Sequence, residues 1–203
     1  QCDIGNAIGQ FPEHFSACCT QQSMRGLFIA GTNTEVGKTY VATAIVRKLV
    51  SSGRRVGVYK PVASGCRLQN GALVAEDAVA LWHAAGKPGV LEHVCPQRFV
   101  APLAPPRAAR LEHKSVDSQL LRSGLEYWRE RCDIVVVEGA GGLMSPLADD
   151  TYNADLAREF RFPLIIVAAN ELGTISATLQ TVITAERYEL PVAGIVLNNV
   201  VAP

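Results

Sequence analysis

The sequence predicts an α/β fold built on a doubly wound, mainly parallel β-sheet. Short segments of apolar, often β-branched residues recur along the chain, and segments with helical periodicity lie between them. Strands that are apolar throughout bury both faces, as the strands of a parallel sheet do. Helices that connect such strands make right-handed crossovers and cover the sheet on both sides. We therefore expect a Rossmann-like arrangement in three layers.

The expected strands are the most apolar short segments of the chain, which lie at residues 27–30, 56–59, 134–137, 164–168 and 194–197. The expected helices lie between them, at residues 38–52, 76–85, 117–131 and 174–188. Apolar residues form a single stripe in the first helix, and Gly53 follows its end. Asp117 is the expected N-cap of the third helix. Residues 100–107 contain three prolines and are expected to form a loop.

The composition is that of one folded domain. Of the 203 residues, 48% are apolar and 19% are charged, which excludes an intrinsically disordered protein. Lys and Arg total 19, as do Asp and Glu, and no run of basic residues exceeds a pair. A nucleic-acid or membrane partner is therefore not expected, and the apolar segments are too short to span a bilayer. The six cysteines lack zinc-site spacing, so we expect reduced thiols and a cytoplasmic location.

Residues 1–23 differ in composition from the rest of the chain. They contain no Lys or Arg and no sustained periodicity, whereas a secretory signal needs a positive start and a continuous apolar segment. We expect a leader outside the domain, either disordered or of artificial origin. Met24 is then the natural first residue of a domain that covers 24–203.

Residues 31–39, with the sequence Gly-Thr-Asn-Thr-Glu-Val-Gly-Lys-Thr, follow the first expected strand and lead into the first helix. Small residues at such a turn let backbone N–H groups close around phosphate oxygens, and the helix N-terminus adds partial positive charge. Lys38 is expected to reach the β- and γ-phosphates, and Thr39 to bind Mg²⁺. The segment predicts a fold of the P-loop NTPase type that binds ATP or GTP. It has five residues between Gly31 and Gly37, where the usual loop has four.

Glu138 directly follows the apolar segment 134–137, and the glycine-rich residues 139–142 come after it. A cation that bridges nucleotide phosphates needs carboxylate oxygens at a strand end near the phosphate loop. Glu138 is therefore the expected metal ligand. Asp77 lies at the start of a predicted helix, where an acidic residue is as commonly a helix cap, so its position alone leaves both roles open.

A second lysine, Lys60, follows the strand 56–59, and Ser64 lies close behind it. Because the carboxyl ends of parallel strands meet at one edge, Lys60 is expected to face the phosphates, with an exposed surface lysine as the alternative. Its ammonium would hold a carboxylate or carbamate beside the γ-phosphate, and Ser64 would donate to the same group. The four histidines show no ligand or catalytic spacing. The expected chemistry is phosphoryl transfer without a covalent protein nucleophile.

Four segments together resemble the dethiobiotin synthetase family, the ATP-dependent carboxylases of biotin synthesis. They are 31–39, 59–65 (Tyr-Lys-Pro-Val-Ala-Ser-Gly), 137–143 (Val-Glu-Gly-Ala-Gly-Gly-Leu) and 197–199 (Leu-Asn-Asn). Residues 99–105 and 172–175 match more weakly. The long phosphate loop is shared with cobyrinate and cobyrate amidoligases, and the other segments make the resemblance specific.

The resemblance implies a ligase that forms C–N bonds. The implied reaction converts 7,8-diaminononanoate, CO2 and MgATP into dethiobiotin, ADP and phosphate through a carbamate and a carbamic–phosphoric anhydride. The catalytic residues implied are Lys60, Lys38, Thr34 and Ser64. The Mg²⁺ ligands implied are Thr39, Asp77 and Glu138. The nucleotide contacts implied are Glu35, Val36, Gly37, Lys38, Thr39, Tyr40, Asp77, Glu138, Gly139, Ala140, Gly141, Asn198 and Asn199. The substrate contacts implied are Thr34, Ser64, Pro102, Leu103, Gly142, Gly173, Thr174, Ile175 and Ser176.

The resemblance also implies a homodimer with its active site at the subunit interface. The helix N-terminus after Gly173 would bind the substrate carboxylate of the partner's site. Two departures from the family stand out. The sequence stops at Pro203, where the family continues with a strand and a helix, so we expect a C-terminally incomplete domain. Ser176 stands where a longer polar residue such as Asn is expected.

Two other functions fit part of the pattern. A fragment of a cobyrinate-type amidoligase would share the phosphate loop, but the intact enzyme needs a glutaminase domain with its own cysteine, for which this chain has no room. A dimeric ATPase switch of the partitioning kind would share the fold. Such switches carry a second lysine early in the phosphate loop, where this chain has Thr32.

Overall fold

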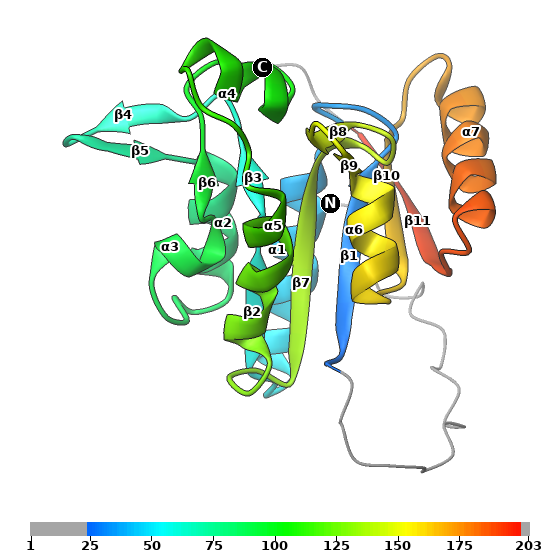
Figure 1. The fold of residues 1–203 in the computed structure, drawn as a ribbon. Helices are drawn as coiled ribbons and strands as arrows, with labels where there is room; N and C mark the ends of the chain where they lie inside the picture. The colour runs from blue at the N-terminus through cyan, green and yellow to red at the C-terminus, as the bar shows by residue number, and fades with distance from the viewer. Residues whose placement is uncertain (1–23, 200–203) are drawn as a thin grey trace.

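The central sheet has five parallel strands, in the order β11-β10-β1-β7-β2 (Figure 1). The computed structural model describes residues 24–199, so the leader predicted at 1–23 lies outside the described residues. The strands are β1 (Gly26–Gly31), β2 (Val56–Tyr59), β7 (Ile134–Gly142), β10 (Leu164–Ala169) and β11 (Val192–Asn198). Each of the five predicted strands is present, and the predicted parallel sheet is confirmed.

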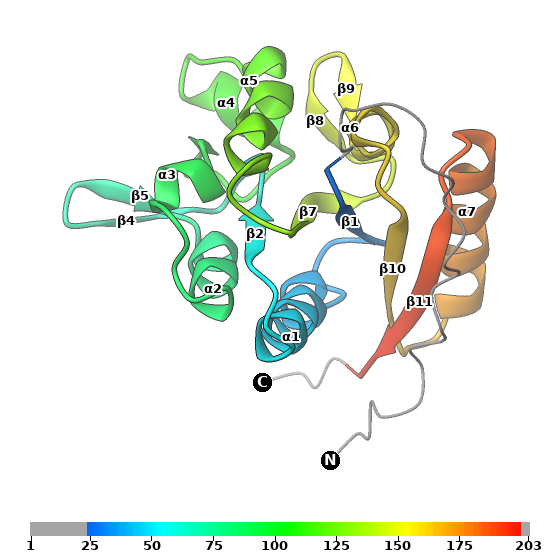
Figure 2. The ribbon, with the colours of Figure 1, turned by 90° about the horizontal axis from the view of Figure 1, so that it is seen from below.

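Helices cover both faces of this sheet, as the doubly wound pattern predicts. Figure 2 shows α1 (Lys38–Ser51) and α2 (Glu76–Ala84) on one face, and α5 (Ser118–Ser123) and α6 (Asn153–Phe160) on the other. A further helix, α7 (Thr174–Arg187), packs against β10. Within residues 24–199 there is no helix long and apolar enough to cross a membrane.

The prolines of residues 100–107 do not prevent a helix. Helix α4 (Pro105–Leu111) begins inside this segment, with prolines at its first two positions. A proline in the first turn lacks only an N–H that has no helical partner there, and its fixed φ suits the helix. The prediction of a loop is therefore wrong for the second half of the segment.

The helix predicted at 117–131 begins as expected and ends early. The Asp117 side chain caps α5 by accepting a hydrogen bond of 2.9 Å from the N–H of Leu120. At Gly124 the chain tightens into a 3-10 helix, η1 (Gly124–Trp128), so the predicted helix does not reach Arg131. A Cβ at Gly124 would collide with the hydroxyl of Tyr59, which explains why glycine lies at this junction.

Several short elements are absent from the prediction. They are α6 and β3 (Val62–Ala63), β4 (Arg67–Gln69), β5 (Ala72–Val74), α3 (Leu91–Val94), β6 (Gln97–Arg98), β8 (Pro146–Ala148) and β9 (Thr151–Tyr152). β3 pairs with β6, β4 with β5 and β8 with β9. Figure 1 shows the β4–β5 hairpin projecting from the body of the protein.

The pairing of β1 with β7 changes register at the carboxyl end of the sheet. Ile29 pairs with Glu138, and Gly31 pairs with Gly142. β7 therefore has three residues between these pairs where β1 has one, which makes a bulge directly after Glu138. Up to that point β7 lies in the core, since Val135, Val136 and Val137 are fully buried. The bulge lies where β7 leaves the core and reaches the predicted site.

Candidate active site

The phosphate loop predicted at residues 31–39 connects the carboxyl end of β1 to the start of α1. Glu35 and Gly37 adopt left-handed backbone conformations, with φ of 61° and 86°. Gly37 is also confined by a neighbour, because a Cβ there would collide with the side chain of Asn198. The Nζ of Lys38 donates a hydrogen bond of 3.0 Å to the backbone oxygen of Asn33. The ammonium of Lys38 therefore contacts the opposite side of the loop, whose backbone curves at the N-terminus of α1. A curved loop at a helix N-terminus is suited to bind phosphate.

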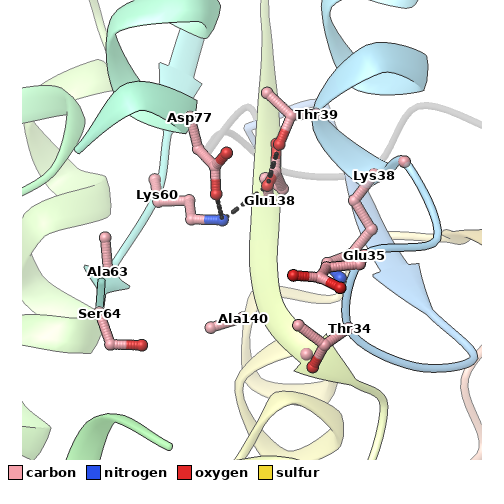
Figure 3. Close-up of a pocket in the computed structure, with 12 residues that line it drawn as sticks. Thr34, Glu35, Lys38, Thr39, Lys60, Ala63, Ser64, Asp77, Glu138 and Ala140 are labelled. Carbon is pink, nitrogen blue, oxygen red and sulfur yellow. Dashed lines mark hydrogen bonds and ion pairs between the residues drawn. The ribbon is translucent and has the colours of Figure 1, made fainter. Parts of the chain in front are cut away.

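Lys60 lies between two carboxylates (Figure 3). Its Nζ is 2.6 Å from Oε1 of Glu138 and 2.9 Å from Oδ2 of Asp77. The hydroxyl of Thr39 donates to the same Oε1 at 2.9 Å. Lys60 is 3% exposed and Glu138 is fully buried, whereas the side chain of Asp77 is half-exposed. A buried cation is therefore paired with the two acidic residues that the sequence analysis singled out.

The topology of the sheet brings these residues together. β2 and β7 are neighbours, and Tyr59 pairs with Val137. The residues that follow them, Lys60 and Glu138, consequently emerge side by side at the carboxyl edge of the sheet. Asp77 reaches this edge from the first turn of α2 and lies against Lys60. The predicted convergence of Lys60 with the phosphate loop is thus present in the fold.

The charges of the site are strongly coupled. Burial works to lower the pKa of Lys60, but the attraction of Glu138 and Asp77 outweighs it and raises that pKa above its usual value. The nearby ammonium of Lys60 in turn lowers the pKa of Asp77. For Lys38, burial and the positive charge of Lys60 lower the pKa to about 8. Lys60 is therefore positively charged at neutral pH. An anionic ligand beside Lys38 would raise the pKa of Lys38 and stabilise its charged form.

The oxygen atoms around Lys60 suit a hard divalent cation. Oε2 of Glu138 is buried and has no hydrogen-bond partner among the described residues. A buried carboxylate oxygen without a partner is costly, so it indicates a position that a ligand completes. Thr39, Asp77 and Glu138 supply only oxygen donors, and Mg²⁺ is typically held by one or two carboxylates together with phosphates. Residues 24–199 contain no cluster of three or more His, Cys, Asp or Glu that could hold a metal ion.

These residues line one pocket of about 370 Å³. Eleven predicted site residues lie in its wall: Thr34, Glu35, Gly37, Lys38, Thr39, Lys60, Ser64, Asp77, Glu138, Ala140 and Gly141. Ala63 also lines the pocket and was not predicted, since its side chain carries no chemistry that a motif would reveal. Figure 3 shows Ser64 and Thr34 on opposite sides of the space beside Ala140. The pocket is large enough for the phosphate end of a nucleotide and a small substrate group.

Comparison with known proteins identifies the family. A family model described as an AAA domain matches residues 25–203. An ATP-dependent dethiobiotin synthetase of Rhodopirellula baltica is 46% identical, over 85% of this chain and 72% of that protein. The synthetases of Anaeromyxobacter dehalogenans and Bacillus subtilis are 45% and 39% identical, each over 87% of this chain and over 77% and 75% of their own lengths. This chain belongs to the dethiobiotin synthetase family. The relatives favour neither the amidoligase nor the partitioning ATPase.

More distant solved structures share the fold of this synthetase family member. The kinase domain of the Escherichia coli tyrosine kinase ETK aligns with a TM-score of 0.55 at 16% identity, over 89% of this chain and 69% of that domain. The chimerical protein CapA2B2 aligns with a TM-score of 0.53 at 11% identity, over 88% and 77%. At these identities the likeness concerns the fold alone. It agrees with the predicted P-loop NTPase architecture.

One of the two predicted asparagines contacts the phosphate loop, and the other contacts a third asparagine. Nδ2 of Asn198 donates to the backbone oxygen of Val36 at 3.1 Å. Oδ1 of Asn199 accepts from Nδ2 of Asn170 at 2.8 Å. The 197–199 segment that resembles the family is thus attached to the loop 31–39. Asn170, which the sequence analysis did not select, joins the same group of amides.

The remaining predicted residues do not line the pocket. Val36 belongs to the loop and is buried, whereas Tyr40 is 66% exposed on the first turn of α1. The backbone oxygen of Gly139 accepts a hydrogen bond of 3.4 Å from Nζ of Lys60. Pro102, Leu103 and Gly142 lie outside the lining, as do four residues at the start of α7: Gly173, Thr174, Ile175 and Ser176. One subunit by itself therefore does not bring the predicted α7 residues into the pocket wall.

Proposed function

We propose that the protein synthesises dethiobiotin from 7,8-diaminononanoate, CO2 and MgATP, with release of ADP and phosphate. The observation that carries this proposal is the buried Lys60 placed between Glu138 and Asp77, beside a phosphate loop. Membership of the dethiobiotin synthetase family supports the substrates. The cytoplasmic location stays a prediction from the cysteine usage.

The phosphate loop is the proposed nucleotide site. Backbone N–H groups of residues 35–39 surround the phosphates, and the ammonium of Lys38 exchanges its contact with Asn33 for the β- and γ-phosphate oxygens. Thr39, Asp77 and Glu138 are the proposed ligands of Mg²⁺, and Oε2 of Glu138 is the oxygen that lacks a hydrogen-bond partner among residues 24–199. When bound, Mg²⁺ would neutralise charge on the phosphates and lower the barrier to phosphoryl transfer. Asn198 is the proposed contact of the nucleobase.

Lys60 acts in this proposal as an electrostatic group. Its pKa is raised by the two carboxylates, so it keeps its proton at neutral pH and is unsuited to act as a general base. A fixed ammonium suits a reaction in which anionic oxygens develop and move. Lys60 therefore stabilises the carbamate and the transferring phosphoryl group, while Thr34 and Ser64 orient the carbamate by hydrogen bonds.

The proposed reaction has three steps. One amine of the diamine adds to CO2, forming an N–C bond and releasing a proton, to give a carbamate. A carbamate oxygen attacks the γ-phosphorus, the bond to the ADP oxygen breaks, and a carbamic–phosphoric anhydride forms. The second amine attacks the anhydride carbon, loses its proton and expels phosphate, which closes the cyclic urea. The protein binds and orients these groups and supplies no covalent nucleophile.

We also propose a homodimer that uses α7. Leu172, Ile175, Leu179 and Ile183 lie on or just before α7 and are between 56% and 105% exposed. The last three recur every four residues and form one apolar stripe along the helix. A second copy of the chain packed on this stripe would bring the N-terminus of α7 near the partner's substrate. This arrangement would account for the finding that the predicted residues 173–176 do not line the pocket of their own subunit.

The decisive experiment measures ADP release by the purified protein with MgATP and bicarbonate, with and without 7,8-diaminononanoate. We expect ADP release that depends on the diamine and a product with the mass of the cyclic urea. ADP release that is indifferent to the diamine, or a different product, would contradict the proposed substrate.

A further inference from the structure

Asn153 holds the chain segment that directly follows Glu138. It is the first residue of α6 and is 1% exposed. Its Oδ1 accepts from the N–H of Ala140 at 3.2 Å, and its Nδ2 donates to the backbone oxygens of Ala140 and Gly142, both at 2.8 Å. One buried side-chain amide thus pairs with both the N–H and the C=O of Ala140, as a neighbouring strand would.

The bulge in β7 explains why this amide is needed. Between the pairs that β7 makes with β1 at Glu138 and Gly142, the bulged residues lose their regular partners on β1. Buried backbone N–H and C=O groups must nevertheless be paired. Asparagine is the shortest side chain that carries a donor and an acceptor on separate atoms, so it can pair with an N–H and a C=O at once. The fit is close, since a Cβ at Gly139 would collide with Oδ1 of Asn153.

The pairing with Asn153 fixes the direction of two peptide groups at the pocket. Peptide bonds are planar and trans, so the N–H of one residue and the C=O of the residue before it point to opposite sides. Because the N–H of Ala140 faces Asn153, the carbonyl of Gly139 faces the other way, where it accepts from Nζ of Lys60 at 3.4 Å. By the same reasoning, the N–H of Gly141 points away from Asn153. Ala140 and Gly141 themselves line the pocket.

We propose that Asn153 is a positioning residue of the active site. It does not line the pocket, but it sets the orientation of the peptide groups between Glu138 and Gly142 that face Lys60 and the reacting groups. Displacement of reacting groups by about 1 Å costs on the order of 100-fold in rate, so a loosened segment lowers turnover. The phosphate loop 31–39 is held by other contacts, and nucleotide binding is largely unaffected. The activity readout of this inference rests on the proposed function.

The test compares two isosteric substitutions. Asn153→Asp keeps the acceptor for Ala140 and removes both donors of Nδ2. Gln97 provides a matched control, because its 8% exposed side chain also pairs with one residue, donating to the backbone oxygen of Asp117 at 3.0 Å and accepting from its N–H at 2.7 Å. Gln97 does not line the pocket, and Gln97→Glu removes the corresponding donor.

We expect both variants to lower the melting temperature to a similar extent. Only Asn153→Asp lowers kcat, by roughly 10- to 100-fold, while the Kd for MgADP stays within about threefold of the wild-type value. Asn153→Ala also removes the acceptor for Ala140, so hydrogen–deuterium exchange at the N–H of Ala140 becomes faster in that variant and not in Gln97→Glu. If the buried carboxylate prevents folding, Asn153→Ala serves in its place.

A folded variant at position 153 with wild-type kcat overturns the proposal, and so does an equal loss of kcat in Gln97→Glu. An absence of diamine-dependent turnover in the wild-type protein contradicts the proposed function instead. In that event the exchange rate of the Ala140 N–H in Asn153→Ala still decides whether Asn153 holds the segment.

Discussion

Nζ of Lys60 lies 2.6 Å from Oε1 of Glu138, the oxygen atom that also accepts the hydroxyl of Thr39. The same ammonium is 2.9 Å from Asp77. The cation of Lys60 therefore contacts all the carboxylates that the proposed Mg²⁺ requires. Repulsion between Lys60 and a second cation on the same carboxylates opposes the binding of Mg²⁺ unless the negative charge of the nucleotide phosphates offsets it.

Mg²⁺ by itself is therefore expected to bind poorly to the wild-type protein. Lys60→Met leaves the carboxylates of Asp77 and Glu138 without their cation, and Mg²⁺ at millimolar concentration should then raise the melting temperature by several degrees without nucleotide. Lys38→Met is the matched control, because Lys60 stays between the carboxylates. An equal response to Mg²⁺ in all three proteins would refute the competition.

Lys60→Ala is expected to lower kcat far more than it weakens ATP binding. The ammonium stabilises charge that develops during transfer, whereas the phosphates are held by the phosphate loop. We expect kcat to fall by about 100-fold or more, with the Kd for ATP measured by calorimetry changing by less than about tenfold. Wild-type turnover in this variant would exclude the role proposed for Lys60.

Lys38→Ala is expected to abolish turnover and to weaken nucleotide binding as well. Its side chain is 7% exposed inside the phosphate loop, and within residues 24–199 no other ammonium donates to the backbone oxygen of Asn33. The contrast with Lys60→Ala distinguishes the roles of the two lysines, since only Lys38 is expected to hold the nucleotide in the ground state. Calorimetric titration with ADP measures this, and an unchanged Kd would contradict the assignment.

Leu179→Glu in the middle of the apolar stripe on α7 is expected to make the protein monomeric. Leu179 is 56% exposed, so the substitution costs the isolated subunit little stability, but it buries charge in the proposed interface. Light scattering gives the oligomeric state. Gln180→Glu, next to it on the exposed surface of α7, is the control for added charge. A wild-type protein that is already monomeric at micromolar concentration would refute the dimer.

The thiol of Cys95 is expected to resist alkylation in the native protein. Burial raises its pKa to about 12, so very little thiolate exists at pH 8. Labelling of Cys95 by iodoacetamide should be at least about 100-fold slower than in the denatured chain. The labelling rate should still rise between pH 8 and 10, whereas the rate for a free thiol with a pKa near 8.5 levels off over this range. Peptide mapping after timed labelling follows each cysteine. A labelling rate of Cys95 that levels off by about pH 10, as for a free thiol, would contradict the prediction.

The sequence predicts those parts of the fold whose periodicity is strong. The strand Val56–Tyr59 has the predicted bounds, and α1 ends within one residue of the expected position. Helix α6 was missed because it has only eight residues, too few for a clear period. The prediction does not include helix α4, because proline disfavours the interior of a helix, whereas in the first turn it favours one.

For the candidate site, motifs predict the residues but not their mutual contacts. Lys60, Asp77 and Glu138 were each expected near the phosphates, yet their direct pairing depends on the register of β2 against β7 and on the placement of α2. Asn153 lies in no motif. It acts through hydrogen bonds to the backbone of Ala140 in the bulge, and these form only in the folded protein. Contacts of this kind follow from tertiary structure rather than local pattern.

The order of the strands has a consequence for synthesis on the ribosome. Thr39 and Glu138 are joined by a hydrogen bond although they are 99 residues apart, and Lys60 and Glu138 are 78 residues apart. Such distant contacts form slowly and need the intervening chain in place. A nascent chain that has exposed its phosphate loop but not β7 has Asp77 but lacks Glu138 in the pocket. ATP in the cell can therefore stabilise the complete pocket only after β7 has been translated.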